Sequence, residues 1–215
     1  MLFQISDSRT FQFFGEIYPR IETSQKVVAL TFDDGPTHSH TEEILSILRE
    51  ENVRATFFLI GGGMAENPGE AEKIIADGHE IGNHTHSHRR MWLASPDFVK
   101  AEIETTDELI RKAGYQGEIT FRPPYGKKLF TLPYYLSEHN RKTIMWDVEP
   151  DTYAEKSDDI IKYALEQTKN GSIIVLHVMY DSRAESMKSV RPIIKILREK
   201  GFEFKTVSEL LSMKS

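Results

Sequence analysis

The ten residues VVALTFDDGP, from Val27 to Pro36, decide the fold of this chain. Five of the first six residues are apolar. A short apolar run that turn residues follow is typical of a β-strand. This strand leads directly into two adjacent carboxylates, Asp33 and Asp34, and then into a Gly-Pro turn. Such residues either form an ordinary polar turn or begin a functional site.

Six further short runs, rich in β-branched and aromatic residues, predict additional strands. They lie at 55–59, 80–83, 120–122, 143–146, 172–177 and 203–206. Amphipathic stretches separate most of these runs and predict helices. The predicted helices cover 41–51, 95–113, 157–169 and 186–200, and a last helix begins at 206.

Capping signals predict where three of the helices begin. Ser39 and Glu42 have the spacing of a capping box ahead of residues 41–51. Ser95–Pro96 places a proline at the first position of a long helix, where proline is tolerated. Thr206 with Glu209 predicts the start of the last helix.

The alternation of strands and helices predicts parallel strands that are joined by right-handed crossovers. Seven strands without a linker-like or low-complexity segment favour one closed or nearly closed α/β barrel in a single domain. A flat, doubly wound sheet is the alternative. Residues 1–25 are expected to form an N-terminal extension that packs against a domain of residues 26–215.

The composition excludes several classes of protein. The 215 residues include no cysteine, which rules out disulfide frameworks, thiolate metal sites and cysteine nucleophiles. The chain has 27 basic and 33 acidic side chains, and a formal net charge of −6 argues against a nucleic-acid partner. Any metal must therefore be held by histidine, aspartate or glutamate, and four of the eight histidines lie within residues 79–88.

No targeting or membrane segment is expected. Residues 1–23 lack the basic start and the apolar stretch of about 7–15 residues that a signal peptide needs. No run approaches the roughly 18 apolar residues of a membrane helix. Two locations stay open: a cytoplasmic protein, or an exported one whose export segment has been trimmed.

The first two candidate sites are the adjacent carboxylates and the histidine cluster. Asp33 and Asp34 diverge at a strand end, so that one of them can bind a metal while the other stays free as a base. In GNHTHSH, residues 82–88, the spacing allows His84 with His88 on a helical turn, or a set that includes His86 on a strand. Two histidines and one carboxylate leave an open position for water, as in catalytic zinc sites.

Three weaker candidates follow later strands. FRPPYG, residues 121–126, holds an arginine and backbone groups in a rigid turn, and WDVEPDT, residues 146–152, is an acidic loop. IIVLH, residues 173–177, is an apolar strand that ends in His177. All five candidates stand at the carboxyl ends of predicted parallel strands, where barrel active sites are built. This shared position makes the set stronger evidence for an active site than any of its members.

Together these motifs, with ATFFLIG at residues 55–61, make the chain closely similar to the polysaccharide deacetylases, the NodB-homology domain of carbohydrate esterase family 4. They occur in the family's order and extend from Val27 toward the C-terminus. The resemblance implies a distorted (β/α)7 barrel and one bound divalent metal, usually zinc, with cobalt or another divalent ion as alternatives. It also implies a cell-wall or carbohydrate hydrolase that removes N-acetyl groups from amino sugars.

The resemblance also implies a role for each matching residue. The metal ligands would be Asp34, His84 and His88, which leaves His86 as a bystander or a substrate contact. Asp33 would be the general base and His177 the general acid. The remaining assignments are Arg122 orienting Asp33, Asp151 orienting His177, Tyr125 donating its backbone N–H to the oxyanion, Pro124 and Trp146 contacting the substrate, and Ile174 and Leu176 lining an acetyl pocket.

Two departures from the family pattern affect the groove wall. Thr152 follows Asp151 where the family commonly has tryptophan, and Val178 follows His177 where it often has aspartate. The leading hypothesis is therefore an N-deacetylase of N-acetylglucosamine-containing glycans, such as peptidoglycan or chitin oligomers. The alternatives are an esterase that removes O-acetyl groups from another polysaccharide, and a non-catalytic glycan-binding relative.

Overall fold

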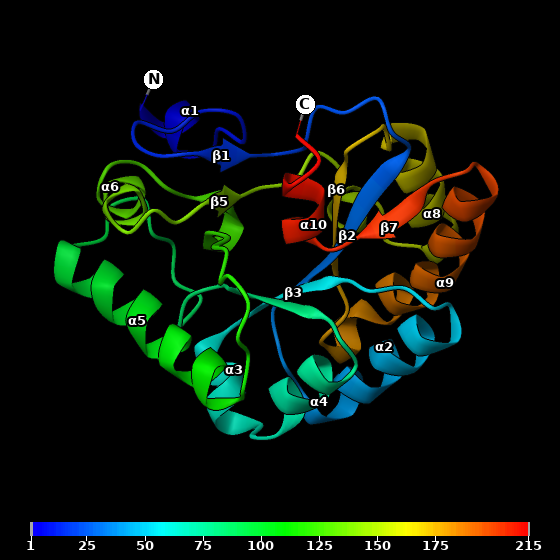
Figure 1. Ribbon diagram of the computed structural model, residues 1–215, viewed down its shortest axis with the longest axis horizontal. Helices are drawn as coiled ribbons and strands as arrows, with labels where there is room; N and C mark the ends of the chain where they lie inside the picture. Colours follow the sequence, from blue (N-terminus) through cyan, green and yellow to red (C-terminus); the bar gives the residue numbers. More distant parts are fainter. Residues whose placement is uncertain (1, 215) are drawn as a thin grey trace.

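The computed structural model describes residues 2–214, in which strands and helices alternate along the chain (Figure 1). The strands are β1 (Ile17–Tyr18), β2 (Val27–Asp33), β3 (Thr56–Leu59), β4 (Glu80–Asn83), β5 (Thr143–Ile144), β6 (Ile173–His177) and β7 (Glu203–Lys205). The longer helices are α2 (His38–Glu50), α5 (Pro96–Lys112), α6 (Thr131–Glu138), α8 (Ser157–Gln167) and α9 (Ala184–Glu199). Short helical segments complete the fold: α1 (Leu2–Ser6), α3 (Gly61–Glu66), α4 (Glu70–Ala76), η1 (Pro124–Gly126), α7 (Pro150–Tyr153), η2 (Asp181–Arg183) and α10 (Val207–Leu211).

Strand β2 is the centre of the sheet. It pairs in parallel with β3, β6 and β7, and the continuous order is β4-β3-β2-β6. The register places Asp33, the last residue of β2, opposite His177, the last residue of β6. Because all these strands are parallel, their carboxyl ends and the loops that follow lie at one end of the sheet.

The remaining strands complete a distorted barrel, as the sequence predicted. Single bridges join Asn83 to Phe121, Phe121 to Thr143, and Val148 to Ile174. Within residues 2–214 no continuous ladder closes the ring. The strand predicted at 120–122 is reduced to the bridge at Phe121, because two prolines follow Arg122 and cannot donate to a ladder.

The N-terminal residues contact the barrel at several points. Strand β1 pairs in parallel with β5. The side chain of Lys128 is buried and donates to the carbonyl of Ser8, and its backbone N–H donates to the carbonyl of Ser6 at 3.1 Å. These contacts place residues 6–8 on the loop that follows the FRPPYG turn. The boundary of the extension at residue 25 stays a prediction.

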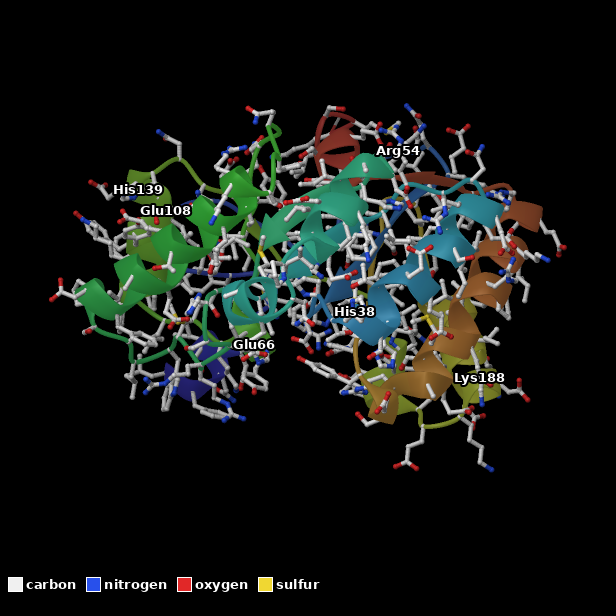
Figure 2. The ribbon with its side chains drawn as sticks, turned by 90° about the horizontal axis from the view of Figure 1, so that it is seen from below. His38, Arg54, Glu66, Glu108, His139 and Lys188 are labelled. Carbon is white, nitrogen blue, oxygen red and sulfur yellow. The ribbon has the colours of Figure 1, made fainter. Side chains whose placement is uncertain are left out.

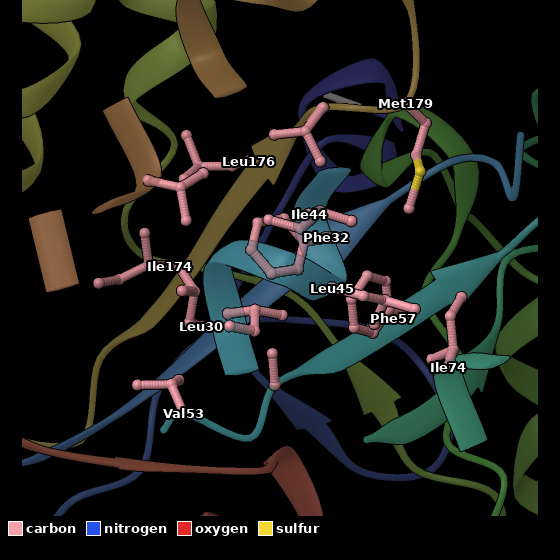
Figure 3. Close-up of a cluster of buried hydrophobic side chains, with 14 of the residues drawn as sticks. Leu30, Phe32, Ile44, Leu45, Val53, Phe57, Ile74, Ile174, Leu176 and Met179 are labelled. Atoms are coloured by element: carbon pink, nitrogen blue, oxygen red, sulfur yellow. The ribbon is translucent and has the colours of Figure 1, made fainter. Parts of the chain in front are cut away.

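The apolar strand β2 is buried on both faces, which explains why its sequence is continuously apolar rather than alternating. One face, with Leu30 and Phe32, packs against helices in the larger core cluster (Figure 3). The other face, with Val27 and Ala29, packs inside the barrel with Trp146. The sheet therefore separates two cores, and the helices cover the outer one (Figure 1).

Two of the three predicted helix starts are confirmed. Ser95 caps α5 by accepting from the N–H of Phe98, and Thr206 with Glu209 forms a complete capping box. The capping box predicted at Ser39 is wrong, because α2 begins at His38 with Thr37 as its N-cap. The hydroxyl of Thr37 donates to the carbonyl of Met179 and thereby ties this helix start to the loop after β6. No helix within residues 2–214 is both long and apolar enough to cross a membrane.

Truncation of the β2 core should destabilise the protein strongly. Leu30 is fully buried between the sheet and its helices, so Leu30→Ala removes contacts and leaves a cavity. We expect a loss of about 2–5 kcal/mol in the free energy of unfolding, measured by urea denaturation. The control is Leu93→Ala, where 71% of the side chain is exposed and a change within about 0.5 kcal/mol is expected. Equal effects of the two substitutions would contradict the assigned core.

Candidate active site

The turn after β2 points the side chains of two adjacent aspartates in different directions. Asp33 ends the strand and is 2% exposed, whereas Asp34 has a left-handed φ of 74°. A non-glycine residue in this region is uncommon, and such strain is concentrated at functional sites. The change in backbone direction lets Asp33 contact a buried arginine while Asp34 faces the histidine loop.

Asp33 is held by a fully buried guanidinium. Arg122 Nη1 donates to Asp33 Oδ1 at 2.5 Å and also to the hydroxyl of Thr31 at 2.8 Å. The other guanidinium nitrogens donate to the carbonyls of Ile144 and Met145. Burial alone would raise the pKa of Asp33, but the charge and hydrogen bond of Arg122, together with the neighbouring histidines, outweigh it and hold the pKa below its ordinary value. Asp33 is therefore an ionised carboxylate at neutral pH.

Asp34, His84 and His88 form a compact group of three possible metal ligands, in which one ligand atom from each lies within 4.8 Å of the others. His88 Nε2 is 3.3 Å and His84 Nε2 is 3.9 Å from Asp34 Oδ1. His84 Nδ1 lies 2.7 Å from the carbonyl of Arg122 and donates to it, so the ring presents Nε2 to Asp34. Burial, and then the neighbouring His84, lower the pKa of His88 to about 4. The imidazole of His88 is therefore neutral, which is the form that binds metal.

These three residues fit a divalent metal. Asp34 Oδ1 is buried and has no hydrogen-bond partner in the protein, which is a costly arrangement unless a ligand satisfies it. Two imidazoles with one carboxylate are a donor set of catalytic zinc, with a position left open for water or substrate. The second contact of His84, to the carbonyl of Arg122, fixes its ring in the way that outer contacts of zinc ligands do.

The histidine segment is neither of the two structures that its spacing allowed. Residues 84–88 form a loop in which Thr85 and His88 have left-handed φ values of 68° and 54°. The loop turns because Thr85 N–H donates to Asn83 and His88 N–H donates to the hydroxyl of Thr85. This turn brings His84 and His88 together and leaves His86 outside the group of ligands.

Glu102 holds this loop in place, and our sequence reasoning missed it. Its buried carboxylate accepts from the backbone N–H groups of His86 and Ser87, at 3.0 and 2.8 Å, and from the Ser87 hydroxyl. The signal was present in the sequence. Glu102 interrupts the apolar face of α5 at helical spacing between Val99 and Thr106. A glutamate inside an apolar stripe needs partners, which are here the histidine loop.

His177 is held by Asp151. Its backbone N–H donates to Asp151 Oδ2 at 2.7 Å, and its Nδ1 lies 3.2 Å from Asp151 Oδ1. The hydroxyl of Ser186 and the side chain of Arg183 also bond to Asp151. Burial alone would lower the pKa of His177, but the hydrogen bond and charge of Asp151 raise it to about 9. His177 is therefore an imidazolium at neutral pH.

The turn that contains Pro124 and Tyr125 lies beside the histidine loop. Pro124 is buried, whereas Tyr125 is 53% exposed and has a left-handed φ of 57°. The ring of Tyr125 lies 4.7 Å from that of His88, and the guanidinium of Arg90 covers it at 4.4 Å. The structure thus brings Tyr125 to the edge of the candidate metal site.

Trp146 lies beneath other side chains. It is 5% exposed, its indole N–H donates to Glu149 at 2.8 Å, and the guanidinium of Arg9 covers its ring at 4.7 Å. Arg9 also forms an ion pair with Glu149 at 2.6 Å, and Thr152 donates to the same carboxylate. Arg9 thus covers the ring of Trp146, and the predicted contact of Trp146 with substrate stays a prediction.

The two residues expected to line an acetyl pocket lie elsewhere. Ile174 and Leu176 are fully buried and pack with Leu30 and Phe32 in the outer core (Figure 3). Alternate residues of a strand face opposite sides, so neither shares the face of His177. Val175 does share that face and packs in the inner core, and the same alternation could have identified it from the sequence.

Comparisons with known proteins agree with this fold. A family model described as polysaccharide deacetylase matches residues 20–144. The chain is 30% identical over 203 residues to a peptidoglycan-N-acetylglucosamine deacetylase of Bacillus cereus, and the match covers 93% of this chain and 95% of that protein. The chain therefore belongs to the polysaccharide deacetylase family.

Solved structures give the same fold. The crystal structure of a peptidoglycan N-acetylglucosamine deacetylase matches with a TM-score of 0.84 and 32% identity, and covers 89% of this chain and 90% of that one. A pseudoenzyme of the same family from Bacillus anthracis matches with a TM-score of 0.83 and 28% identity, over 93% of this chain and 69% of that one. Because the family has such members, the activity must be argued from the residues of the site.

Removal of one candidate ligand should abolish metal binding. We expect His84→Ala to weaken zinc binding by more than about 100-fold, because changes outside the ligand shell alone cost 10–100-fold. Calorimetric titration with zinc and the metal content after dialysis measure this loss. The matched control is His139→Ala, an exposed histidine on the outer part of the molecule (Figure 2), which should bind zinc like the unchanged protein. Equal binding by the His84 variant would contradict the assigned ligands.

The role of Glu102 can be tested on the same helix. Glu102→Ala leaves two backbone N–H groups of the histidine loop without their acceptor, so we expect about 1–3 kcal/mol of destabilisation. Zinc affinity should fall about tenfold, since the loop carries two of the three candidate ligands. Thermal unfolding and zinc titration measure both effects. Glu108→Ala, an exposed residue of α5, should change neither, and unaltered zinc affinity in Glu102→Ala would refute the role.

Proposed function

We propose that the chain is a metal-dependent hydrolase that removes N-acetyl groups from N-acetylglucosamine-containing glycans, such as peptidoglycan or chitin oligomers. One observation carries the proposal. An ionised carboxylate, Asp33, and a protonated imidazole, His177, stand opposite each other in register on β2 and β6, next to the group formed by Asp34, His84 and His88. A base, an acid and a metal-binding group are what amide hydrolysis requires.

The metal would supply Lewis acidity, which polarises the acetyl carbonyl and lowers the pKa of water toward neutrality. Asp34, His84 and His88 would hold it, and the donor set favours zinc, with cobalt or another divalent ion as alternatives. The protein residues would carry out the proton transfers. Asp33 would not be a metal ligand, because its Oδ1 accepts a hydrogen bond from Arg122.

Asp33 would act as the general base. Its carboxylate stays ionised because Arg122 lowers its pKa, and Asp33 Oδ2 faces His84 at 3.7 Å. An oxygen in this position can accept the proton of the attacking water. Arg122 would keep the carboxylate oriented, since its guanidinium is itself fixed by Thr31 and by two backbone carbonyls.

His177 would act as the general acid. The carboxylate of Asp151 holds its Nδ1 and raises its pKa to about 9, so that Nε2 carries a proton at neutral pH. Transfer of this proton to the departing nitrogen releases the amine. The backbone N–H of Tyr125 would donate to the developing oxyanion, a contact worth about 3–4 kcal/mol in comparable enzymes.

The proton-transfer roles are tested by substitutions that leave the metal group intact. We expect Asp33→Asn and His177→Ala each to reduce acetate release by about 100- to 10,000-fold, the usual contribution of a positioned acid or base. Substrates are chitin oligomers, peptidoglycan and acetylxylan, each assayed with added Zn²⁺ or Co²⁺. Zinc titration of the same variants should give nearly unchanged affinity, because neither side chain is a ligand.

The substrate panel separates the rival functions. Acetate release from acetylxylan alone would replace the N-deacetylase by an O-acetyl esterase. Glycan binding without turnover by the metal-loaded, unchanged protein would indicate a non-catalytic relative. Full activity of Asp33→Asn would contradict the mechanism whatever the substrate.

A further inference from the structure

A cavity of about 340 Å³ opens directly beside the candidate metal group and shares His88 with it. The segments that follow four parallel strands line it: Gly35–Thr37 after β2, residues of α3 and its two flanking positions after β3, His86–His88 after β4, and Tyr180 after β6. Its volume is at the lower end of the range for small-molecule sites, about 300–1,000 Å³. None of the catalytic roles proposed above uses this cavity.

Close backbone packing joins the segments that line the cavity. A Cβ atom added at Gly63 would lie 2.7 Å from the carbonyl oxygen of Gly35, and one added at Gly62 would lie 3.0 Å from that of His86. The amide side chain of Asn67 joins the same loops, because it donates to the carbonyls of Pro36 and Gly63. The segments that line the cavity are therefore held together by close backbone contacts and by the side chain of Asn67.

The rim carries one carboxylate that no cation neutralises. Glu66 lines the cavity and is exposed, and within residues 2–214 its carboxylate has no ion pair or hydrogen bond. No lysine or arginine lines the cavity in that part of the chain. Tyr180, which also lines the cavity, is 42% exposed. Both side chains line the same cavity, so one ligand that fills it can contact both.

We propose that this cavity binds the sugar next to the one being deacetylated, and that Glu66 favours a neighbour that already carries a free amine. The inference rests on the proposed function. An N-acetylated sugar is neutral, whereas its deacetylated form presents an ammonium group at neutral pH. The unneutralised carboxylate of Glu66 complements that ammonium, and the half-exposed ring of Tyr180 offers an apolar face to the pyranose.

The proposal has a direct consequence for the product. Each deacetylation creates the ammonium group that the cavity selects, so a sugar beside a finished one becomes a better substrate than a sugar in a fully acetylated stretch. The free amines should then appear in runs along the glycan. The same ammonium chemistry could come from an amine-bearing peptide, which has the charge and lacks the ring.

The test compares N-acetylglucosamine dimers with dimers in which either ring has a free amine. The unchanged, zinc-loaded protein should deacetylate one of the two mixed dimers about fivefold more efficiently than the fully acetylated dimer, the size of one partly exposed ion pair. Glu66→Gln should remove this ratio. Glu108→Gln makes the same change in net charge on the outer side of α5, away from Glu66 (Figure 2), and should retain it.

A binding measurement distinguishes a failure of the cavity proposal from a failure of the proposed N-deacetylase activity. Calorimetric titration with glucosamine dimer should show weaker binding to Glu66→Gln than to the unchanged protein or Glu108→Gln. If the protein releases acetate but Glu66→Gln keeps the same preference between mixed and fully acetylated dimers, the cavity proposal is wrong and the N-deacetylase activity is supported. Absence of turnover with Glu66-dependent glucosamine binding would overturn the N-deacetylase and leave an amino-sugar site. Equal binding of a lysine peptide and the glucosamine dimer would overturn the assignment of the cavity to a sugar.

Discussion

The buried ion pair between Arg122 and Asp33 is the interaction on which the rest of the site depends. Both side chains are almost inaccessible to water, and a charge in such a position is costly unless a partner and further hydrogen bonds satisfy it. Arg122 meets this condition with Thr31 on β2, two carbonyls near β5 and the ring of Phe58 on β3. Its own carbonyl orients His84. One residue thus connects the base, a candidate metal ligand and three strands.

Parallel register brings the remaining groups to the same place. Because β2 and β6 run in the same direction and end together, Asp33 and His177 stand opposite each other although 143 residues lie between them in the chain. The loops after β2 and β4 then need only short turns to place Asp34 and the histidines beside them. These turns are strained. Four of the six non-glycine residues with positive φ in the described chain belong to the site: Asp34, Thr85, His88 and Tyr125. Strain of this kind persists only where surrounding contacts determine the conformation, as Glu102 does for the histidine loop.

Much of this arrangement could be predicted from the sequence because it depends on local patterns. The apolar run of β2, the alternation of strands and helices, and the caps at Ser95 and Thr206 have local physical causes. The polar residues at strand ends also indicated a site, since parallel strands end together. The errors lay where a distant contact decides the structure. The start of α2 is one example, because Thr37 bonds to the loop after β6. The contact of Arg9 with the ring of Trp146 was not predicted for the same reason, since 136 residues lie between them in the chain.

By itself, the sequence determined the class of fold, the family resemblance and the types of residue available for chemistry, because these follow from patterns within short segments. Only the tertiary structure decided which atoms meet. It placed Ile174 and Leu176 in the outer core, brought His84 and His88 together through a loop rather than a helix, and left Glu66 unneutralised on the rim of a cavity. The physical reason is that burial, charge pairing and cavity shape depend on segments far apart in the chain, and these acquire neighbours only when the barrel forms.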